Sequence, residues 1–290
     1  MHTPSSYMKD IPLIFVHKDN SSYLEPVLTH NYNFNREADI YLLGDGSNIN
    51  SPFVKHIMME QYSTTAIEFE KIYKHMSSNS YEFELGCFQR WFIINEFVKE
   101  RGIEHFVCLD SDVLLFCNVS EVFSHFVSYD FTVSQQHSPH ITLFSRESLD
   151  RFCNYLRDLY TKPDYINRFK LSYQEFKDEN RQGGICDMFA FSLYPKDISD
   201  NIKELSDLSG DFFFDNNMNE EDELEMENGL KKIYWKNGLP YAKTLHSGLD
   251  IRLYGMHFQG GAKAKVSKYV LNKNLKRPGI ISSLKELFTK

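Results

Sequence analysis

Long apolar runs are absent from this 290-residue sequence, and cysteine and tryptophan are scarce. No segment approaches the roughly 18 consecutive apolar residues of a membrane-spanning helix, and the first apolar run, residues 11–16, is too short for the core of a signal peptide. The five cysteines show no Cys-x-x-Cys spacing, which argues against a zinc cage and against a disulfide framework. We therefore expect free thiols and a cytoplasmic location.

An excess of basic residues is also absent. The chain has 32 Lys and Arg against 40 Asp and Glu, a net charge of −8, so we expect no nucleic-acid partner. Much of the acidity falls within residues 220–227, which we interpret as a solvent-exposed loop. With 42% apolar and 25% charged residues the chain has a globular composition, and its length fits one large α/β domain with a small appendage.

The pattern along the chain alternates between apolar strands and amphipathic helices. This alternation predicts an α/β fold with a mostly parallel central sheet and flanking helices. We expect strands at 11–16, 38–43 and 105–109, and helices at 20–34, 52–62, 66–75, 84–101, 146–160, 165–178 and 185–194. Asn20-Ser21-Ser22 should cap the first helix, and Gly102 should end the fourth. Ligands of such sheets bind at the carboxyl ends of the strands, here after His17, Leu43 and Leu109.

Two carboxylates follow the strand at 105–109, in the sequence Asp110-Ser111-Asp112. Carboxylates at a half-buried strand end are costly unless a positive charge lies between them, and residues i and i+2 can point the same way. Hard oxygen ligands suit Mg²⁺ or Mn²⁺. The alternative is a turn that caps a helix beginning near Val119.

A second polar motif, His257-Phe-Gln-Gly260-Gly261-Ala-Lys263, follows a strand-like segment late in the chain. A histidine can complete the coordination of a cation held by Asp112. Glycines let backbone amides approach phosphate oxygens, and Lys263 offers a positive charge to a diphosphate. The two motifs together predict a site for a metal ion and a diphosphate.

Asp-x-Asp after an apolar strand, followed by a late His-x-x-Gly-x-x-Lys, resembles the metal-dependent glycosyltransferases of the GT-A fold, and the late motif is similar to that of glycosyltransferase family 8. The resemblance implies a Rossmann-like GT-A fold, Mn²⁺ or Mg²⁺ as cofactor, and transfer of a sugar from a nucleoside-diphosphate donor to a hydroxyl acceptor, with retention. A UDP-sugar is the preferred donor and a GDP-sugar the alternative. The acceptor would be a glycan or a lipid-linked glycan.

The resemblance also implies roles for single residues. Asp110, Asp112 and His257 would hold the metal, and Asp187 would be the catalytic carboxylate beside the transferred sugar, although Asp is also common at a helix start. His137 and His140 would line the acceptor side. The residues expected to bind the donor are Val16, His17, Asp45, Arg90, Asp110, Ser111, Gly260, Gly261 and Lys263.

We divide the chain into a GT-A domain, residues 1–262, and a basic tail, residues 263–290. The tail carries a short apolar stripe, so it either contacts an anionic membrane surface peripherally or packs on the domain. Two other functions stay open: a sugar nucleotidyltransferase of the same fold, and a non-catalytic protein that binds nucleotide sugars. The Gly-rich loop expected of a nucleotidyltransferase is missing after the first strand.

Overall fold

The larger of two main sheets forms the centre of the protein. The computed structural model describes residues 10–48 and 51–270. Seven strands lie in the order β3-β2-β1-β4-β7-β6-β8, and four of their six pairings are parallel. The predicted α/β fold with a mostly parallel sheet is therefore confirmed. The strands are β1 (Leu13–Val16), β2 (Ile40–Gly44), β3 (Lys55–Met58), β4 (His105–Leu109), β6 (Phe131–Val133), β7 (Ile141–Ser145) and β8 (Ile202–Glu204).

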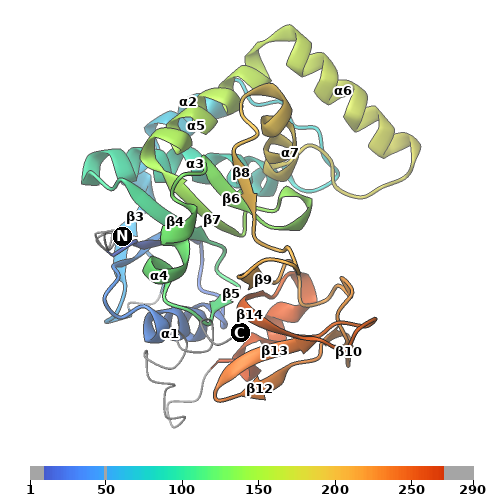
Figure 1. Cartoon of the computed structure of the whole chain (residues 1–290). Helices are drawn as coiled ribbons and strands as arrows, with labels where there is room; N and C mark the ends of the chain where they lie inside the picture. Colours follow the sequence, from blue (N-terminus) through green and yellow to red (C-terminus); the bar gives the residue numbers. More distant parts are fainter. Residues whose placement is uncertain (1–9, 49–50, 271–290) are drawn as a thin grey trace, which may run out of the picture.

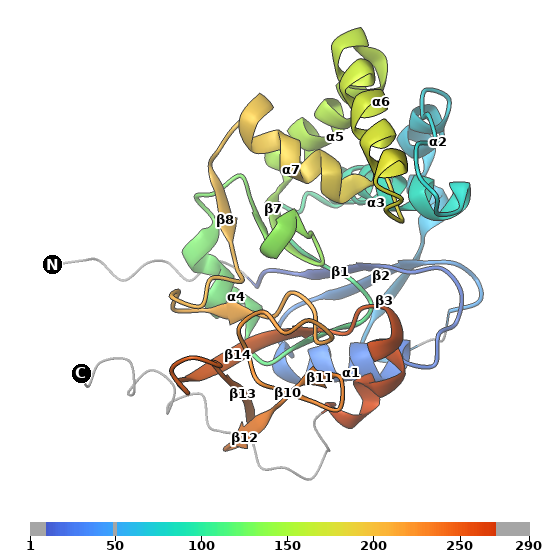
Figure 2. The same ribbon diagram turned by 90° about the vertical axis from the view of Figure 1, so that its right-hand side faces the viewer.

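Helices cover one face of this sheet, and one helix with a second sheet covers the other (Figures 1 and 2). On the first face lie α2 (Thr64–Glu70), α3 (Tyr81–Arg101), α5 (Arg146–Thr161), α6 (Pro163–Asp178) and α7 (Asp187–Asp197). On the second face lies α1 (Leu24–Phe34), with the short α4 (Val119–Phe123) packed into the same core. Single turns of 3-10 helix are η1 (Met59–Tyr62), η2 (Ser124–Phe126) and η3 (Gln135–His137), and a longer one is η4 (Gly260–Lys268).

The two cores follow from the alternation of side chains along each strand. In β1, Leu13 and Phe15 pack in the core that contains α1, whereas Ile14 packs in the core that contains α3. Successive residues of a strand point to opposite faces, so a strand buried on both faces must be apolar throughout. This is why the strands read as continuous apolar runs in the sequence.

The second sheet is antiparallel, in the order β12-β13-β14-β5. Its strands are β5 (Val113–Leu115), β12 (Tyr234–Lys236), β13 (Leu239–Lys243) and β14 (Asp250–His257); β9 (Phe213–Phe214) pairs with β14, and β10 (Met226–Glu227) pairs with β11 (Leu230–Lys231). Residues 110–112 are all that separates β4 in the large sheet from β5 in the small one. The Asp-Ser-Asp motif thus lies at the junction of the two sheets.

Most predicted elements are present, with two corrections. Helix α3 ends at Gly102, whose φ of +64° confirms the predicted glycine C-cap. The helix predicted at 52–62 is wrong: residues 55–58 form β3, which pairs in parallel with β2 at the edge of the sheet, and η1 follows. The predicted side-chain cap of α1 is also wrong, because Tyr23 occupies the N-cap position and makes no side-chain cap hydrogen bond.

The last part of the chain falls largely outside the described residues. Lys263 lies within η4, whose Ala262 and Val266 are buried in the core beside α1. The division at 262/263 and the membrane contact of the tail stay predictions, since residues 271–290 are not among those described. Within the described ranges, no helix combines the length and the apolar character needed to cross a bilayer.

Candidate active site

The structure brings together the three residues predicted to hold a metal. Asp110 and Asp112 follow β4, and His257 ends β14, which pairs with β5 so that His257 lies opposite Val113. One ligand atom from each of Asp110, Asp112 and His257 lies within 4.8 Å of the others. Among the described residues this is the one group of three or more acidic, His or Cys side chains with such spacing.

Asp112 is a buried carboxylate with two cationic neighbours. Its Oδ1 lies 3.5 Å from Nε2 of His257, and its Oδ2 lies 3.1 Å from Nζ of Lys263. Burial by itself would raise the pKa of the Asp112 carboxyl, but His257 and Lys263 outweigh burial and lower this pKa. Asp112 is therefore a buried anion, and its electrostatic attraction for a cation is stronger than it would be at the solvent-exposed surface.

His257 is held in one orientation by the neighbouring segment 215–217 and by His140. Its Nδ1 lies 2.7 Å from the carbonyl oxygen of Asn216, so Nδ1 carries the proton and donates it. Nε2 faces Asp112, whose charge favours the protonated imidazole, and Nε2 is the nitrogen that can offer a lone pair to a metal ion once its proton is lost. On its other side the ring stacks on His140, with centroids 4.0 Å apart and an interplanar angle of 13°. A hydrogen bond at the second ring nitrogen is typical of histidines that bind metals.

The segment 215–217 is itself fixed by a buried cation, Lys231. Its Nζ forms an ion pair with Asp215, donates to the carbonyl oxygen of Asn217 at 3.0 Å, and pairs with Asp222 at 2.9 Å. The pairing of Asp222 corrects the interpretation of residues 220–227 as simply a solvent-exposed loop, because one of these carboxylates neutralises a fully buried ammonium group. Other members of the run, including Glu221 and Glu223, are exposed as predicted.

Arg90 links Asp110 of the candidate metal site to Asp187. From the middle of α3 it donates through Nη1 to Asp110 at 2.6 Å and through Nη2 to Asp187 at 2.7 Å. Asp187 begins α7, and its Oδ2 also accepts from the indole N–H of Trp91 at 3.0 Å. The guanidinium carbon lies 4.5 Å from the centre of the Trp91 ring system. Asp187 is consequently a buried and neutralised carboxylate, and one guanidinium group separates it from the candidate metal ligand Asp110.

His17 lies at the end of β1 and reaches the Asp-Ser-Asp motif. Its Nδ1 is 2.9 Å from the hydroxyl oxygen of Ser111, while its buried Nε2 has no hydrogen-bond partner in the described chain. Burial and the charge of Lys263 lower the pKa of His17, so the imidazole is neutral near pH 7. An unpartnered polar atom here is the kind of group that a bound ligand satisfies.

The other residues predicted to bind a donor are Val16, Asp45, Gly260 and Gly261, and they differ in how exposed they are. Val16 lines a gap of about 10 Å³ together with Arg90 and Asp110. Asp45 accepts from the backbone N–H of Asp19 at 3.0 Å and of Ser47 at 2.8 Å, and so joins the loops after β1 and β2. Gly260 and Gly261 are exposed at the start of η4, and Gly260 has a φ of +56°.

The two histidines predicted on the acceptor side differ in exposure. His140 is 1% exposed and lies behind His257, with Nδ1 2.9 Å from the Ser138 hydroxyl and Nε2 3.1 Å from the carbonyl oxygen of Asp215. His137 is half-buried, in η3. The structure therefore associates His140 with the orientation of His257, not with the surface.

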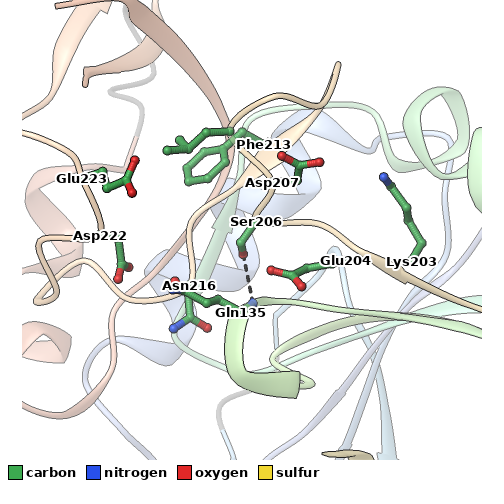
Figure 3. Close-up of a pocket in the computed structure, with 10 residues that line it drawn as sticks. Gln135, Lys203, Glu204, Ser206, Asp207, Phe213, Asn216, Asp222 and Glu223 are labelled. Carbon is green, nitrogen blue, oxygen red and sulfur yellow. Dashed lines mark hydrogen bonds between the residues drawn. The ribbon is translucent and has the colours of Figure 1, made fainter. Parts of the chain in front are cut away.

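A cavity of about 400 Å³ opens beside this region, between β8, β9 and the segment 215–223 (Figure 3). Gln135, Ser206 and Asn216 line it together with several acidic side chains. From the sequence, Asp215-Asn216-Asn217 is a further candidate for the acceptor side, with a simple turn as the alternative. Neither the cavity nor the carbonyl contact of Asn216 has a sequence signal, since both depend on how β9 and β14 pair.

Comparison with known proteins gives structural likeness only. No protein-family model and no curated protein matches the chain. Solved structures with a similar arrangement include mouse xyloside xylosyltransferase 1 in its apo form, with a TM-score of 0.47, 10% identity, and coverage of 68% of this chain and 85% of that chain. The galactosyltransferase LgtC, in complex with donor and acceptor sugar analogs, has a TM-score of 0.44 and 9% identity, and the match covers 90% of this chain and 97% of that chain. The bifunctional glycosyltransferase WbbM in its apo form has a TM-score of 0.46 and 9% identity, and the match covers 92% of this chain and 50% of that chain.

All three matches are glycosyltransferases by name. Because the identities are 9–10% and the TM-scores lie below 0.5, we draw no conclusion about this chain from them. The resemblance to family 8 stays a prediction.

Proposed function

We propose that the chain is a metal-dependent glycosyltransferase, which moves a sugar from a nucleoside-diphosphate donor to a hydroxyl group. The observation that carries the proposal is the convergence of Asp110, Asp112 and His257, with Lys263 at 3.1 Å from Asp112. A divalent metal and an ammonium group beside the same carboxylate would together form a cationic site suited to a diphosphate. We take a UDP-sugar as donor, with a GDP-sugar as alternative.

The donor set fits Mn²⁺ or Mg²⁺. Two carboxylates supply hard oxygen ligands, and the Nε2 lone pair of His257 faces the same point because Nδ1 is hydrogen-bonded to Asn216. The metal would neutralise the charge that develops on the leaving diphosphate, which is the usual role of a cation in this chemistry. Lys263, 40% exposed at its side chain, can reach outward to the same phosphates.

The remaining residues place the donor around that diphosphate. The unpartnered Nε2 of His17 would form a hydrogen bond with the nucleoside. Val16 and Ser111 would lie beside His17, and Asp45 would border the ribose or the base. Gly260 and Gly261, without side chains, leave the amides at the start of η4 open to phosphate oxygens. Arg90 would contact the donor while it holds Asp110 and Asp187.

Asp187 would orient the transferred sugar. Its Oδ2 accepts from both Arg90 and Trp91, which lowers its nucleophilicity and favours a hydrogen-bonding role over covalent attack. Retention would then proceed by attack of the acceptor hydroxyl on the same face as the departing phosphate, whose oxygen accepts the proton. The acceptor would be a glycan or a lipid-linked glycan, with His137 near its entry.

The test measures binding of UDP with Mn²⁺ by calorimetry and release of UDP from UDP-sugars. Asp112→Asn should weaken Mn²⁺-dependent binding of UDP more than about a hundredfold, because a neutral amide replaces a buried charged ligand. Asp200→Asn, which removes an equally acidic but exposed side chain at the surface, should leave binding unchanged. Equal UDP affinity in wild type and Asp112→Asn, with or without EDTA, would refute the metal site.

The products separate the proposed activity from its two rivals. A glycosyltransferase releases UDP from the sugar nucleotide and transfers or hydrolyses the sugar. A sugar nucleotidyltransferase would instead form the nucleotide sugar from a nucleoside triphosphate and release pyrophosphate. A protein that only binds nucleotide sugars would show Mn²⁺-dependent binding with no product of either kind.

A further inference from the structure

The cavity beside the metal site is strongly acidic (Figure 3). Figure 3 shows Asp222 and Glu223 on one side and Glu204, Asp207 and Lys203 on the other. Four carboxylates thus surround about 400 Å³ of space, against one ammonium group from the lining. Such a lining attracts a cationic group and repels an anionic one.

No three carboxylates of the cavity lie close enough together to share a single metal ion. Among the described residues, only Asp110, Asp112 and His257 bring three ligand atoms within 4.8 Å of one another. Asp222 is in addition partly neutralised by Lys231, at 2.9 Å. Carboxylates distributed around the cavity suit an extended organic ligand that carries hydroxyl and ammonium groups at several positions.

Independent of its charge, the cavity offers an unpartnered polar atom. Asn216 is 8% exposed and lines the cavity, and its buried Oδ1 has no hydrogen-bond partner in the described chain. Its Nδ2 reaches Glu220 only at 3.4 Å. A buried carbonyl oxygen without a donor is costly, and a ligand with N–H or O–H groups in the cavity would supply that donor.

Asn216 also connects the cavity to the reaction centre. Its side chain lines the cavity, while its backbone carbonyl oxygen accepts from Nδ1 of His257 at 2.7 Å. A ligand in the cavity would therefore lie one residue away from a metal ligand. Phe213 adds an aromatic surface to the lining, which suits the apolar face of a sugar ring.

We propose that this cavity binds the acceptor and selects a saccharide that carries a protonated amino group. This inference rests on the proposed function, because it assigns the acceptor class of that same site. Glu204 and Asp207 would face the ammonium group, and Asn216 would accept from the same sugar unit. Saccharides with carboxylate or phosphate groups in this unit would be excluded by charge.

The test uses three disaccharides with the same linkage: chitobiose with free amines, N,N′-diacetylchitobiose and cellobiose. Their binding is measured by calorimetry with UDP and Mn²⁺ present, at about pH 6, where primary amines are protonated. We expect chitobiose to bind about fivefold to tenfold more tightly than either neutral analogue, with a preference that shrinks as salt is added.

Two double variants serve as test and control. Glu204→Gln/Asp207→Asn should reduce the preference for chitobiose to about twofold or less. Glu68→Gln/Glu175→Gln removes the same number of charges from exposed positions on α2 and α6 and should keep the preference. The four side chains are all exposed, so the folds should be unaffected.

The outcomes separate this inference from the proposed function. Absence of tighter chitobiose binding while UDP and Mn²⁺ bind would overturn the inference alone, as would a preference that survives in Glu204→Gln/Asp207→Asn. If chitobiose is preferred but UDP does not bind with Mn²⁺, the cavity has the proposed selectivity and the glycosyltransferase assignment fails.

Discussion

The ion pairs of Arg90 allow a quantitative prediction about the site. Replacing Arg90 by Met removes both of its carboxylate contacts, to Asp187 at 2.7 Å and to Asp110 at 2.6 Å, and keeps a side chain of comparable length. The Asp187 side chain is 5% exposed, whereas that of Asp110 is 32% exposed. The two contacts therefore differ in what their loss should cost.

Leaving a buried charge unpaired costs about 3–5 kcal/mol, whereas loss of an exposed pair costs about 0–1 kcal/mol. The carboxylate of Asp187 would keep two donors, the indole N–H of Trp91 at 3.0 Å and the backbone N–H of Met188 at 2.9 Å. Water can replace Arg90 at Asp110. We therefore expect Arg90→Met to lower the free energy of unfolding by about 3 kcal/mol, nearly all of it through Asp187.

The measurement is a double-mutant cycle by urea denaturation. Asp187→Asn alone should cost about 1–2 kcal/mol, and Arg90→Met/Asp187→Asn should cost less than Arg90→Met, because the unpaired charge is gone. If the losses of the two single variants add to that of the double variant within about 0.5 kcal/mol, Arg90 and Asp187 do not act as a pair. In the folded Asp187→Asn variant, turnover should fall severely while UDP affinity stays within about twofold.

Three further predictions concern other charged groups. Lys263→Ala should weaken UDP binding about tenfold to a hundredfold but leave uridine binding unchanged, as calorimetry would show; equal losses would contradict a phosphate contact. Lys231→Met should cost about 3–5 kcal/mol of unfolding free energy by stranding Asp215, and Lys231→Met/Asp215→Asn should recover part of it in urea titrations. Burial lowers the pKa of His30 to about 4, so folding stability should fall by about 3 kcal/mol as pH drops from 6.5 to 4, and His30→Gln should flatten this slope.

The sequence was sufficient to predict that Asp110, Asp112 and His257 come together, because a general rule connects their positions to the fold. Asp110 and Asp112 follow an apolar strand, and ligands of α/β sheets bind at the carboxyl ends of such strands. His257 follows another apolar segment and has glycines after it. These local patterns coincide with the observed junction of β4, β5 and β14.

Other features depend on contacts between distant segments and leave no local pattern. The strand β3 consists of Lys55, His56, Ile57 and Met58, of which none is fully buried, so the helical spacing of its neighbours dominated the prediction. Pairing with β2 at the sheet edge overrides that preference. In the same way, Lys231 became a buried partner of Asp215 only because β11 lies against the segment 215–217.

The distance between Asp112 and His257 in the candidate metal site is set by the register of β5 against β14. His257 lies opposite Val113, and the N–H of Phe258 donates to the carbonyl oxygen of Asp112 at 3.0 Å. A slip of one residue would turn His257 to the other face of the sheet. Gly255 permits this register, because a Cβ there would lie 2.8 Å from Phe214 and 2.9 Å from the side chain of Ile141. The candidate metal ligands are thus held at the junction of the two sheets.

The wall of the acidic cavity is built differently. Glu204 ends β8, Asp207 lies in a turn, and Asp222 and Glu223 adopt positive φ angles between β9 and β10. Loops of this kind tolerate substitution better than paired strands, since few core contacts depend on them. Changes in these loops would therefore alter the lining of the proposed acceptor cavity, while the register between β5 and β14 keeps Asp112 and His257 together. If the proposed assignments hold, this separation would let a rigid donor site coexist with an adaptable acceptor site.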